Sequence, residues 1–446
     1  MLQRKLIAVL SVIALLAVTA GTGHASLSRV EGMGLSVPAL SQFTDDYANI
    51  YAYPSSVVRQ NNLVLAELGN NPGEAEDAFT PEDQSFTLIR NFPRLGVIAV
   101  QIKQSALNLY NGSDNVNNEW FDIIWGKAFT KMDFAVRFDL SNSYYEIEAA
   151  GPISGAISMR GYDPFGDPYP FGTSFFSDAI VANGIELNTY GVTPSISLHM
   201  NNDNRLDLSA TYRRYSLSRE QSGAFFAPEP EVWEDAGNAS YAVLARYFMN
   251  KSDASQWYLA GWYTNDDLSY EVRNWDGGGL GETPRSADET YKSYGVGIAN
   301  NMRVNDNNLL LWGLAAWQAK HDYERGDNND AVASTDTKTL EEKSTMLPVL
   351  FAAVETQATS WLKLRIGATN MISQDRAETS DFGAPTQSST IKARLTDFNL
   401  SLGTGIRWNN LDIDMTLNEE FPFTGGNVLS GSEQSVFTRA SATYHF

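Results

Sequence analysis

The chain lacks cysteine altogether and contains only four histidines. The first absence excludes disulfide bonds, thiolate zinc sites and cysteine nucleophiles. Basic residues are also scarce, since 32 lysines and arginines stand against 53 aspartates and glutamates and leave a formal net charge of −21. A nucleic-acid partner is not expected, because binding to phosphates needs a large basic surface. Aromatic residues, in contrast, make up 12% of the chain, which argues against a disordered acidic polypeptide.

Residues 1–25 have the three parts of a secretory signal peptide. Arg4 and Lys5 form a basic start, Leu6–Val18 is apolar, and Gly23-His24-Ala25 offers small residues for cleavage. An N-terminal anchor helix is the alternative, but such a helix needs about 20 apolar residues. We therefore expect the segment to be removed on export. The rest of the chain has no apolar run of the ~18 residues that a spanning helix requires.

Apolar and polar residues alternate in many later segments, from about residue 94 to the end. In 131–140, for example, Met132 and Val136 share one face, while Asp133 and Arg137 share the other. Side chains on a β-strand point alternately to its two faces, so a period of two predicts strands. The same alternation occurs in the segments 205–213, 362–369, 398–408 and 411–418.

These segments are long for a soluble sheet. They cover about 10–17 residues, whereas soluble strands usually have five or six and a tilted strand needs about 9–11 to cross a bilayer. Short connections such as Asn409-Asn410 alternate with long polar ones such as 151–183, which is typical of outer-membrane barrels. Because only a helix or a closed sheet satisfies its own backbone in lipid, the predicted fold is an all-β, antiparallel, up-and-down transmembrane barrel.

The strand number follows from the count of alternating segments. Fourteen are found from residue 120 onward when 131–140 and 143–150 are counted separately, and Leu63–Leu68 and Arg94–Lys103 are candidates for two more. Because bacterial barrels have an even number of strands, we expect about 14, within a range of 12–16, formed by residues 63–446. Five tryptophans near the ends of segments are expected to lie in interfacial girdles or, alternatively, in a core: Trp120, Trp257, Trp312, Trp361 and Trp408.

Short connections also predict which residues face each other across neighbouring strands. The turn at Asn409-Asn410 places Trp408 opposite Leu411 and Arg407 opposite Asp412. A three-residue connection at 202–204 places Asn201 opposite Arg205 and His199 opposite Asp207. Opposite charges facing each other in this way stabilise a sheet by about 0.2–1 kcal/mol. The cross-strand pairs we predict are therefore Trp408–Leu411, Arg407–Asp412, Asn201–Arg205 and His199–Asp207.

Charged and polar residues on the polar face of these strands are expected to face the lumen. In a pore they would set selectivity, and in a narrow lumen they would fill the space with ion pairs. The acidic residues in connections such as 74–83 either attract cations or simply keep the loops solvated. The expected lumen-facing residues are Lys131, Asp133, Arg137, His199, Arg205, Asp207, Arg213, Arg246, Lys363, Arg365, Arg407, Asp412 and Asp414.

The chain ends in Tyr444-His445-Phe446, and Tyr444 and Phe446 fall on the same face of the last alternating segment. A terminal aromatic residue in this position is similar to the signature of outer-membrane proteins that the barrel-assembly machinery recognises. This resemblance implies an assembly signal at Tyr444 and Phe446. It also implies the outer membrane as the location, with its lipid and lipopolysaccharide as surroundings.

Residues 26–62 have a different character. Gly32-Met33-Gly34 is followed by an aspartate-containing stretch, 45–51, and then by Pro54. This order resembles the opening of the long-chain fatty-acid transporter (FadL-like) superfamily of outer-membrane proteins, although the neighbours of Pro54 differ from the family pattern. The resemblance implies a fourteen-stranded barrel with an N-terminal plug, or hatch. The plug would contain Gly32, Met33, Gly34, Asp45, Asp46, Asn49 and Pro54; the alternative is a flexible periplasmic tail.

Enzymatic, metal and cofactor chemistry is not expected. After the signal peptide the histidines are His199, His321 and His445, and the chain has no G-x-S-x-G motif near them. A serine hydrolase needs both a histidine base and a positioned nucleophile, and three scattered histidines make a poor metal site. The glycines at 277–281 are not flanked by the strand and helix of a nucleotide-binding loop. His199 is therefore expected to be a polar lumen residue.

The sequence favours a channel for passive uptake of small solutes, hydrophobic ones included, through the outer membrane. The alternative from another class is a barrel that does not transport but anchors a surface or secreted partner through its long connections. A small-molecule substrate is the partner expected in the first case. Neither the substrate nor the oligomeric state is encoded in any motif of the chain.

Overall fold

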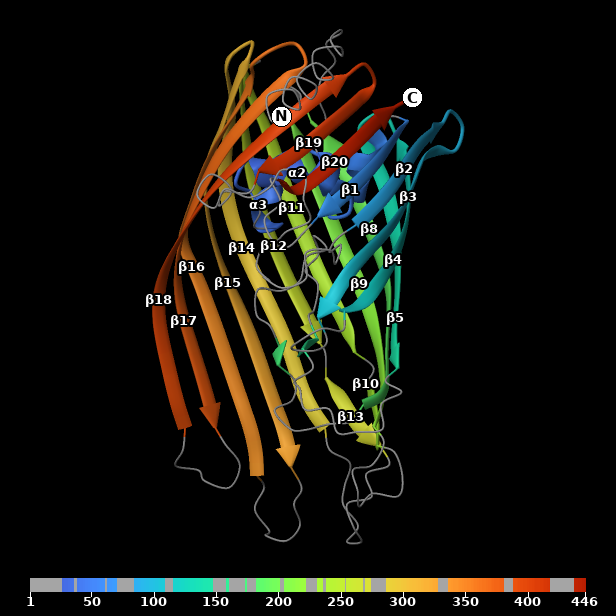
Figure 1. Cartoon of the computed structure of the whole chain (residues 1–446), viewed down its shortest axis with the longest axis vertical. Helices are drawn as coiled ribbons and strands as arrows, with labels where there is room; N and C mark the ends of the chain where they lie inside the picture. The colour runs from blue at the N-terminus through green and yellow to red at the C-terminus, as the bar shows by residue number, and fades with distance from the viewer. Residues whose placement is uncertain are drawn as a thin grey trace, which may run out of the picture.

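The computed structural model is a closed antiparallel barrel that surrounds an N-terminal helical segment (Figure 1). The predicted signal peptide, residues 1–25, and the acidic connection 74–83 lie outside the residues that the structure describes. These are residues 26–35, 38–60, 62–69, 84–108, 115–146, 158–159, 173–174, 182–200, 204–221, 231–235, 238–252, 254–267, 269–273, 286–327, 336–380, 388–417 and 437–446.

Four short helical turns precede the barrel: α2 (Leu27–Gly32), α3 (Pro38–Ser41), η1 (Tyr47–Ile50) and η2 (Pro54–Arg59). The Ser26 hydroxyl caps α2 by accepting a hydrogen bond from the Arg29 backbone N–H at 3.3 Å, the usual role of an N-cap serine. Gly34 follows α2 with a φ of +70°, a conformation that glycine adopts at little cost. None of the helices in the described part of the chain has the length and apolar character needed to cross a membrane.

The barrel strands follow in sequence order. A separate two-stranded sheet, β6 (Ser158–Met159) with β7 (Thr173–Ser174), lies between β5 and β8 in the chain. The barrel strands are β1 (Leu63–Gly69), β2 (Gln84–Phe92), β3 (Gly96–Asn108), β4 (Asn115–Ala128), β5 (Met132–Glu146), β8 (Ala182–His199), β9 (Arg205–Gln221), β10 (Glu231–Asp235), β11 (Ala239–Ser252), β12 (Ser255–Asp267), β13 (Tyr270–Arg273), β14 (Ser286–Asn305), β15 (Asn308–Asp327), β16 (Asp336–Gln357), β17 (Leu362–Ser380), β18 (Ser388–Trp408), β19 (Leu411–Leu417) and β20 (Phe437–His445).

The sheet closes on itself because β1 pairs with both β2 and β20. The sheet contains eighteen segments. Two of them continue a neighbour, since β10 prolongs the line of β11 beside β9, and β13 prolongs the line of β12 beside β14. The ring of the barrel therefore has sixteen strands.

The count is sixteen rather than the expected fourteen, at the upper limit of the predicted range. The segments 131–140 and 143–150 were predicted as two strands, but Ser141-Asn142-Ser143 forms no turn and lies inside β5. Ser141 faces inward, buried to 1% exposure between Trp120 and Thr189, so a polar residue there needs no turn. The strands β1, β2 and β3 complete the ring.

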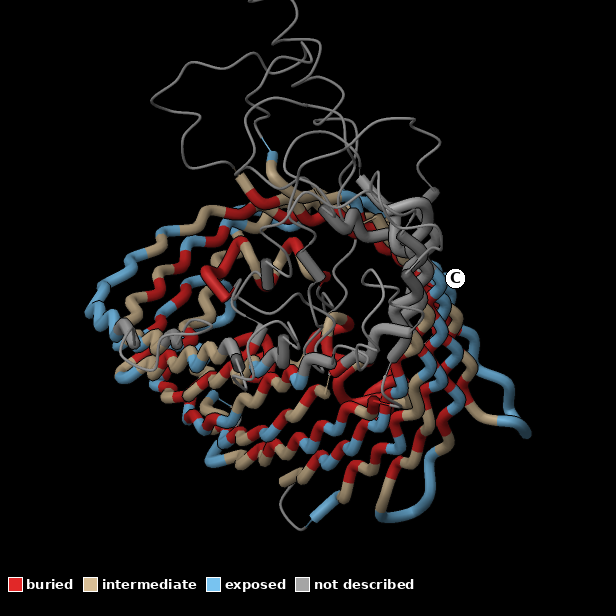
Figure 2. Tube along the Cα trace, turned by 90° about the horizontal axis from the view of Figure 1, so that it is seen from below, coloured by how far each residue is buried: buried red, intermediate tan, exposed pale blue. Residues whose placement is uncertain are grey.

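Buried and exposed residues alternate along the strands (Figure 2). On β15, Leu311, Ala315 and Trp317 are buried, whereas Trp312 and Leu314 between them are more than two-fifths exposed. Large apolar side chains are exposed on the outer face of most strands. An apolar outer surface around a partly charged interior is the arrangement that a barrel in lipid requires.

The tryptophans expected in girdles occupy different positions. Trp312 and Trp408 are both 43% exposed on the outside of the barrel, and Trp257 meets Trp312 edge to face with ring centres 5.4 Å apart. Trp120 instead points inward with 7% exposure, beside Arg213. The outward tryptophans are placed as interfacial girdles require. Trp120 is instead an interior residue, the alternative position considered for these tryptophans.

One end of the barrel carries the C-terminus and the tight turns. The backbone N–H of His445 donates to the Asn410 carbonyl of the turn between β18 and β19 at 2.8 Å, and Asn409 in that turn has a φ of 53°. We call this the short-turn end, and the end from which the long connections leave the long-loop end. In Figure 1 the short-turn end is at the top.

The predicted registers are right at one turn and wrong at the other. Trp408 faces Leu411 and Arg407 faces Asp412, as expected from a two-residue turn. Between β8 and β9, however, His199 rather than Asn201 faces Arg205. The correct register is shifted by two residues because Met200 still bonds across the connection, its N–H donating to the Asn204 carbonyl at 2.8 Å. An even shift leaves every side chain on its predicted face.

Candidate functional site

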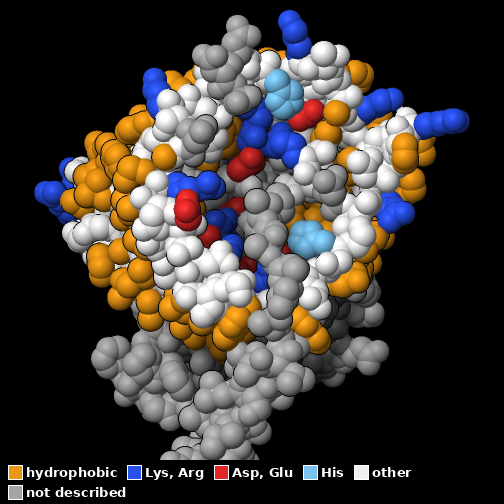
Figure 3. Space-filling view, turned by 90° about the horizontal axis from the view of Figure 1, so that it is seen from above, with side chains coloured by type: hydrophobic (Ala, Val, Ile, Leu, Met, Phe, Trp, Pro, Cys, Tyr) orange, Lys and Arg blue, Asp and Glu red, His pale blue; other side chains and the backbone are white. Residues whose placement is uncertain are grey.

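The described residues of 26–60, namely 26–35 and 38–60 and here called the N-terminal segment, lie inside the ring at the short-turn end (Figure 1). The segment touches the wall all around the ring rather than along one side. Seen from this end, charged side chains gather in the hollow enclosed by the strands (Figure 3). Contacts to β19, β2, β8, β11 and β16 are made by the pairs Ser26–Asp414, Tyr51–Thr87, Ser55–Ser197, Thr44–Arg246 and Phe43–Phe351.

Both halves of the segment pack against the barrel wall through apolar side chains. Met33 and Phe43 join a buried cluster with inward side chains of the strands β11 to β16, and Phe43 stacks on Phe351 at a ring distance of 5.2 Å. Tyr47 and Ile50 join a second cluster with β1 to β5. Fully burying one such side chain stabilises a fold by about 1.5–3 kcal/mol. The segment is therefore seated by its apolar side chains as well as by charge.

Glycines let the backbone of the segment approach the wall closely. A Cβ placed on Gly32 would lie 2.9 Å from the Gly403 Cα of β18, a distance that real Cβ atoms do not adopt. A Cβ placed on Gly367 of β17 would overlap the carbonyl of Met33. Gly34 completes this approach, since its carbonyl accepts a hydrogen bond from the Thr369 hydroxyl. The Gly-Met-Gly sequence thus meets glycines of the wall.

Asp45 is the centre of a first ion-pair cluster, which joins the segment to β9 and β11. Its carboxylate lies 2.9 Å from the guanidinium of Arg205, 3.4 Å from that of Arg246 and 3.5 Å from that of Arg59. Asp207, with no exposed side-chain surface, lies 2.9 Å from both Arg205 and Arg246. Charges removed from water this completely are stable only when they are paired in this way.

Burial by itself would raise the pKa of the Asp45 carboxyl. The three surrounding guanidinium groups, of Arg205, Arg59 and Arg246, outweigh this effect and hold its pKa below the ordinary value of 3.8. Asp45 is consequently ionised at neutral pH and carries a charge that the wall compensates. Arg246 also donates to the Thr44 carbonyl at 3.0 Å, so one wall residue binds both the charge and the backbone of the segment.

Arg29 is the centre of a second cluster, on β16 to β19. Its guanidinium lies 2.7 Å from both Asp46 and Glu355. Glu355 also accepts from Arg365 at 2.6 Å, and Arg365 reaches Asp414 at 2.7 Å. The cluster thus runs as an unbroken chain of ion pairs from the segment into three strands of the wall.

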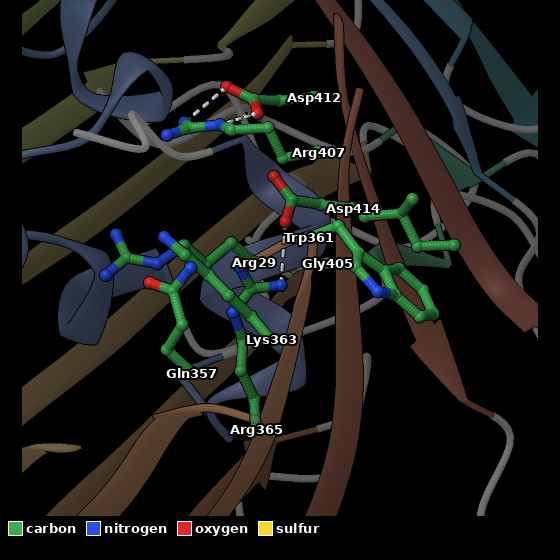
Figure 4. Close-up of a pocket in the computed structure, with 10 residues that line it drawn as sticks. Arg29, Gln357, Trp361, Lys363, Arg365, Gly405, Arg407, Asp412 and Asp414 are labelled. Carbon is green, nitrogen blue, oxygen red and sulfur yellow. Dashed lines mark hydrogen bonds and ion pairs between the residues drawn. The ribbon is translucent and has the colours of Figure 1, made fainter. Parts of the chain in front are cut away.

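A small cavity of about 20 Å³ opens beside this second cluster. Arg29, Lys363 and Arg365 line it, and Arg407 and Asp412, which also line it, point toward each other (Figure 4). The Arg407–Asp412 distance is 2.5 Å. A cavity of this size holds about one water molecule, so it is a gap in the ion-pair network rather than a ligand pocket.

A third cluster lies on β4, β5 and β9. Arg137 donates to Asp122 at 2.7 Å, and Arg213 donates to Asp139 at 3.0 Å. Arg137 also donates to the Tyr51 carbonyl of the N-terminal segment at 3.0 Å. As Arg246 does with Thr44, an arginine of the wall here binds a backbone carbonyl of the segment.

Most of the residues predicted to face the lumen do point inward. Lys131 does not, because it lies exposed in the turn before β5. His199 lies at the short-turn end with 41% of its side chain exposed, and it pairs with Asp133 at 3.0 Å. The buried or half-buried inward residues are Asp133, Arg137, Arg205, Asp207, Arg213, Arg246, Lys363, Arg365, Arg407, Asp412 and Asp414.

The remaining predicted residues are also placed. Asn49 is 1% exposed and its side-chain amide donates to the Thr44 carbonyl at 2.9 Å. Pro54 begins η2 and is buried. Tyr444 and Phe446 are 49% and 47% exposed, at the short-turn end, so the terminal aromatic residues are accessible.

Several charged residues of these clusters were missed by the sequence analysis. Asp139 has a signal, because it alternates in 131–140 on the same face as Asp133 and Arg137. Glu355 and Asp122 have none within their own strands, since no residue predicted to face the lumen lies on β16 or β4. Only their cross-strand neighbours, Arg365 and Asp139, show their direction. Arg29 and Arg59 have none, since they belong to the helical segment, where no period of two exists. No cluster suited to a metal ion is found among the described His, Asp and Glu residues.

Comparisons with known proteins give structural similarity only. No family model and no curated sequence matches the chain. The chain is similar in structure to FadL-like outer-membrane barrels. A FadL homologue of Pseudomonas aeruginosa aligns over 96% of this chain and 99% of its own, at 13% identity and a TM-score of 0.41.

Two further solved structures are similar to a smaller degree. The toluene transporter TbuX of Ralstonia pickettii aligns over 93% of this chain and 95% of its own, at 11% identity and a TM-score of 0.36. The ferric-catecholate import receptor Fiu of E. coli aligns over 86% and 81%, at 9% identity and a TM-score of 0.35. At such identities the likeness concerns the barrel fold and does not extend to a substrate.

Proposed function

We propose that the protein is an outer-membrane channel for passive uptake of small solutes, and that the N-terminal segment is its plug. The number of strands carries this proposal. Barrels of eight strands fill their interior with their own side chains, whereas barrels of 16–18 strands leave a channel. A sixteen-stranded wall is therefore wide enough for a path, and residues 26–60 occupy that space at the short-turn end.

The outer surface supports a place in a bilayer. On β15 the outward residues Leu310, Trp312, Leu314 and Ala316 are apolar, and they lie between Asn308 and Gln318. Ten residues of strand span ~34 Å, which a tilt of about 40° reduces to a height of ~26 Å. An outer-membrane barrel has an apolar band about 25 Å tall. The height of this band thus fits a bilayer.

The ion-paired seat of the segment supports a plug that can be moved. Asp45 keeps 35% of its side chain exposed beside Arg205, and ion pairs that water reaches are weakened by salt, whereas a continuous apolar core would fix the segment permanently. Here both kinds of contact are present, and charged groups line the side toward the short-turn end (Figure 3). A shift of the segment would open a path lined by the arginines and carboxylates of the wall.

The test uses the absence of native cysteine. Ser55 Oγ lies 2.8 Å from Ser197 Oγ of β8, so the double variant Ser55→Cys/Ser197→Cys places two thiols for a disulfide between segment and wall. We expect small-solute flux into liposomes to fall on oxidation and to return on reduction. The single variant Ser55→Cys is the matched control and should not respond to oxidant.

Deletion of residues 26–60 supplies the complementary measurement. We expect a larger single-channel conductance in planar bilayers than for the whole chain. A whole chain that inserts but passes no solute, together with a deletion variant that is equally inert, would overturn the proposal. That result would favour a non-transporting anchor, for which a partner that binds the long connections should be found.

A further inference from the structure

Five basic side chains form a row across the outer face of the barrel near its long-loop end. The strands that carry them, β14 to β18, lie side by side as the longest strands of the wall (Figure 1). Neighbouring strands are about 4.8 Å apart, so the row is ~19 Å long. Each member faces the next directly in the strand register, and the row consists of Lys292, Lys320, Lys343, Arg376 and Lys392.

The alternation of the strands shows that this row points outward. Tyr291, His321 and Ser344 are at most 4% exposed and point into the barrel. Each is next to a member of the row in the chain, and adjacent residues of a strand point to opposite faces. Arg376 and Lys392 share the face of Lys343 because they are its neighbours in register.

The row lies just beyond the apolar band of the outer surface. Two residues nearer the short-turn end, about 7 Å along the strands, the outward positions are polar or aromatic on β14 to β17, and Arg394 occupies the position on β18. Tyr294 and Gln318 occupy two of them, and the Gln318 amide donates to the Tyr294 hydroxyl at 2.7 Å. Beyond these residues come Val296, Ile298 and Leu314, all more than two-fifths exposed. The basic row therefore lies where lipid headgroups would begin.

Nearby carboxylates neutralise only part of the positive charge of the basic row. Lys320 pairs with Asp322 at 2.8 Å and with Glu341 at 3.5 Å, and Arg376 pairs with Glu378. Among the residues that the structure describes, Lys292, Lys343 and Lys392 form no ion pair. All three acidic residues are one step farther from the apolar band, where they would repel a phosphate bound at the wrong height.

The surface on the long-loop side of the basic row is hollowed. The hollow has a volume of about 650 Å³, and Lys320 is its one basic residue. Five carboxylates and three threonines also line it: Asp288, Asp322, Glu324, Glu341, Glu378, Thr290, Thr339 and Thr390. Its size suits a sugar ring, whose hydroxyl groups can donate to the carboxylates and threonines, while these carboxylates would keep a phosphate at the basic row. Cations for phosphate, an adjacent polar hollow and an apolar wall below them match one amphiphile, a phosphorylated glycolipid.

We propose that the outer face of β14–β18 binds the phosphate groups of lipopolysaccharide in the outer leaflet. The inference rests on the proposed location of the barrel in an outer membrane. The lysines and Arg376 would contact phosphate by charge-assisted hydrogen bonds, while the acyl chains lie along the apolar band. Because the row spans five strands, one lipid would be held by several cations at once.

The triple variant Lys292→Gln/Lys343→Gln/Lys392→Gln tests the proposal, because it removes the cations that have no carboxylate partner. We would titrate bisphosphorylated lipid A into the detergent-solubilised full chain and follow binding by native mass spectrometry. We expect the triple variant to bind on the order of a hundredfold more weakly, from the usual effect of a cation at an anionic membrane surface. Lys251→Gln, at the exposed short-turn end of β11, should bind like the wild type.

Two further probes separate the sources of phosphate. Lipid A stripped of its phosphates should bind the wild type weakly, and inorganic phosphate at the same concentration should not displace bisphosphorylated lipid A. Three results would each overturn the proposal: equal binding by wild type and triple variant, equal binding of stripped lipid A, or displacement by inorganic phosphate.

Folding and transport are read out separately. Heat-modified gel migration shows whether the triple variant still forms a barrel, and Lys343→Arg, which keeps the charge, should retain lipid A binding if it does. Conductance in phosphatidylcholine bilayers requires no lipid A. A conducting barrel whose lipid A binding is insensitive to the triple variant would overturn this site alone. A wild type and a 26–60 deletion variant that are both inert would overturn the proposed function.

Discussion

Arg246 has 1% of its side chain exposed, yet it carries a full positive charge within the barrel. Its guanidinium joins three groups that differ in origin: Asp207 of the neighbouring strand at 2.9 Å, Asp45 of the N-terminal segment at 3.4 Å and the Thr44 carbonyl at 3.0 Å. Its guanidinium carbon also lies 4.2 Å from the ring centre of Tyr53. One side chain therefore links wall and segment, and its loss leaves two carboxylates short of a partner.

Replacing this guanidinium should be costly. For Arg246→Met we expect a loss of about 3–5 kcal/mol in the free energy of unfolding, because truncating one member of a buried ion pair leaves its partner uncompensated. Urea titration of the barrel in lipid or detergent measures the effect. Lys251→Met, exposed on the same strand, should change stability by less than about 0.5 kcal/mol. Equal effects of the two variants would contradict the importance of the buried cluster.

Asp45 should make stability depend on acid pH. Since arginines hold its pKa below the ordinary value of 3.8, its contribution is fully present above pH ~4 and is lost as the pH falls through the lowered pKa of the folded state. The difference in unfolding free energy between wild type and Asp45→Asn should therefore be constant from about pH 5 to pH 8 and shrink below about pH 4. A difference that grows on acidification would show that the sign is wrong.

At the scale of elements, the N-terminal segment depends on backbone contacts that only glycine permits. Gly367 of β17 faces Met33 and Gly34 so closely that no Cβ fits between them. Gly32 and Gly403 repeat the arrangement one strand further on. The seat of α2 against the wall is therefore determined by the absence of side chains at facing positions, and it can be disturbed without touching any charge.

Gly367→Ala should loosen the segment while the barrel stays closed. We expect faster proteolysis between residues 26 and 60 and a higher conductance, because the new Cβ overlaps the Met33 carbonyl. The matched control is Gly261→Ala on β12, where the nearest atom to a Cβ is 3.5 Å away. Should the two variants be digested at the same rate as the wild type, the close approach would have no role in holding the segment.

The alternating elements were predictable from sequence, and the segment inside them was predictable only in part. Asp133 and Asp414 could be assigned to the inner face because a period of two fixes the direction of every side chain on a strand. Arg29 could not be assigned, since its partners Asp46 and Glu355 are distant in the chain. The turn wrongly expected at Ser141 has a different cause: a polar residue within a strand is mistaken for a loop residue when the interior of the barrel is itself polar.

At the scale of the whole molecule, the apolar band on the outside and the basic row beside it indicate how deep each outward residue would lie in a membrane. Leu314 is near the middle of the band and is 45% exposed, while Gln318 of the same strand lies at its edge, beside Tyr294. The same substitution at these two positions therefore tests the effect of depth in the membrane.

Leu314→Arg should reduce the free energy of folding into a bilayer by about 2–4 kcal/mol, because a cation near the midplane of the membrane loses its hydration. Gln318→Arg should cost only about 0–1 kcal/mol, since the side chain reaches the interface. Urea-dependent folding into lipid vesicles gives both values. If both arginines cost the same, the band does not face hydrocarbon.

The closure of the ring has a consequence for the order of assembly. The N-terminal segment runs directly into β1, and β1 is the strand whose pairing with β20 seals the cylinder. If β1 and β20 paired first, the helical N-terminal segment would have to enter a barrel that is already closed. Entry before closure avoids that passage, so the N-terminal segment would be enclosed while the wall still has two free edges.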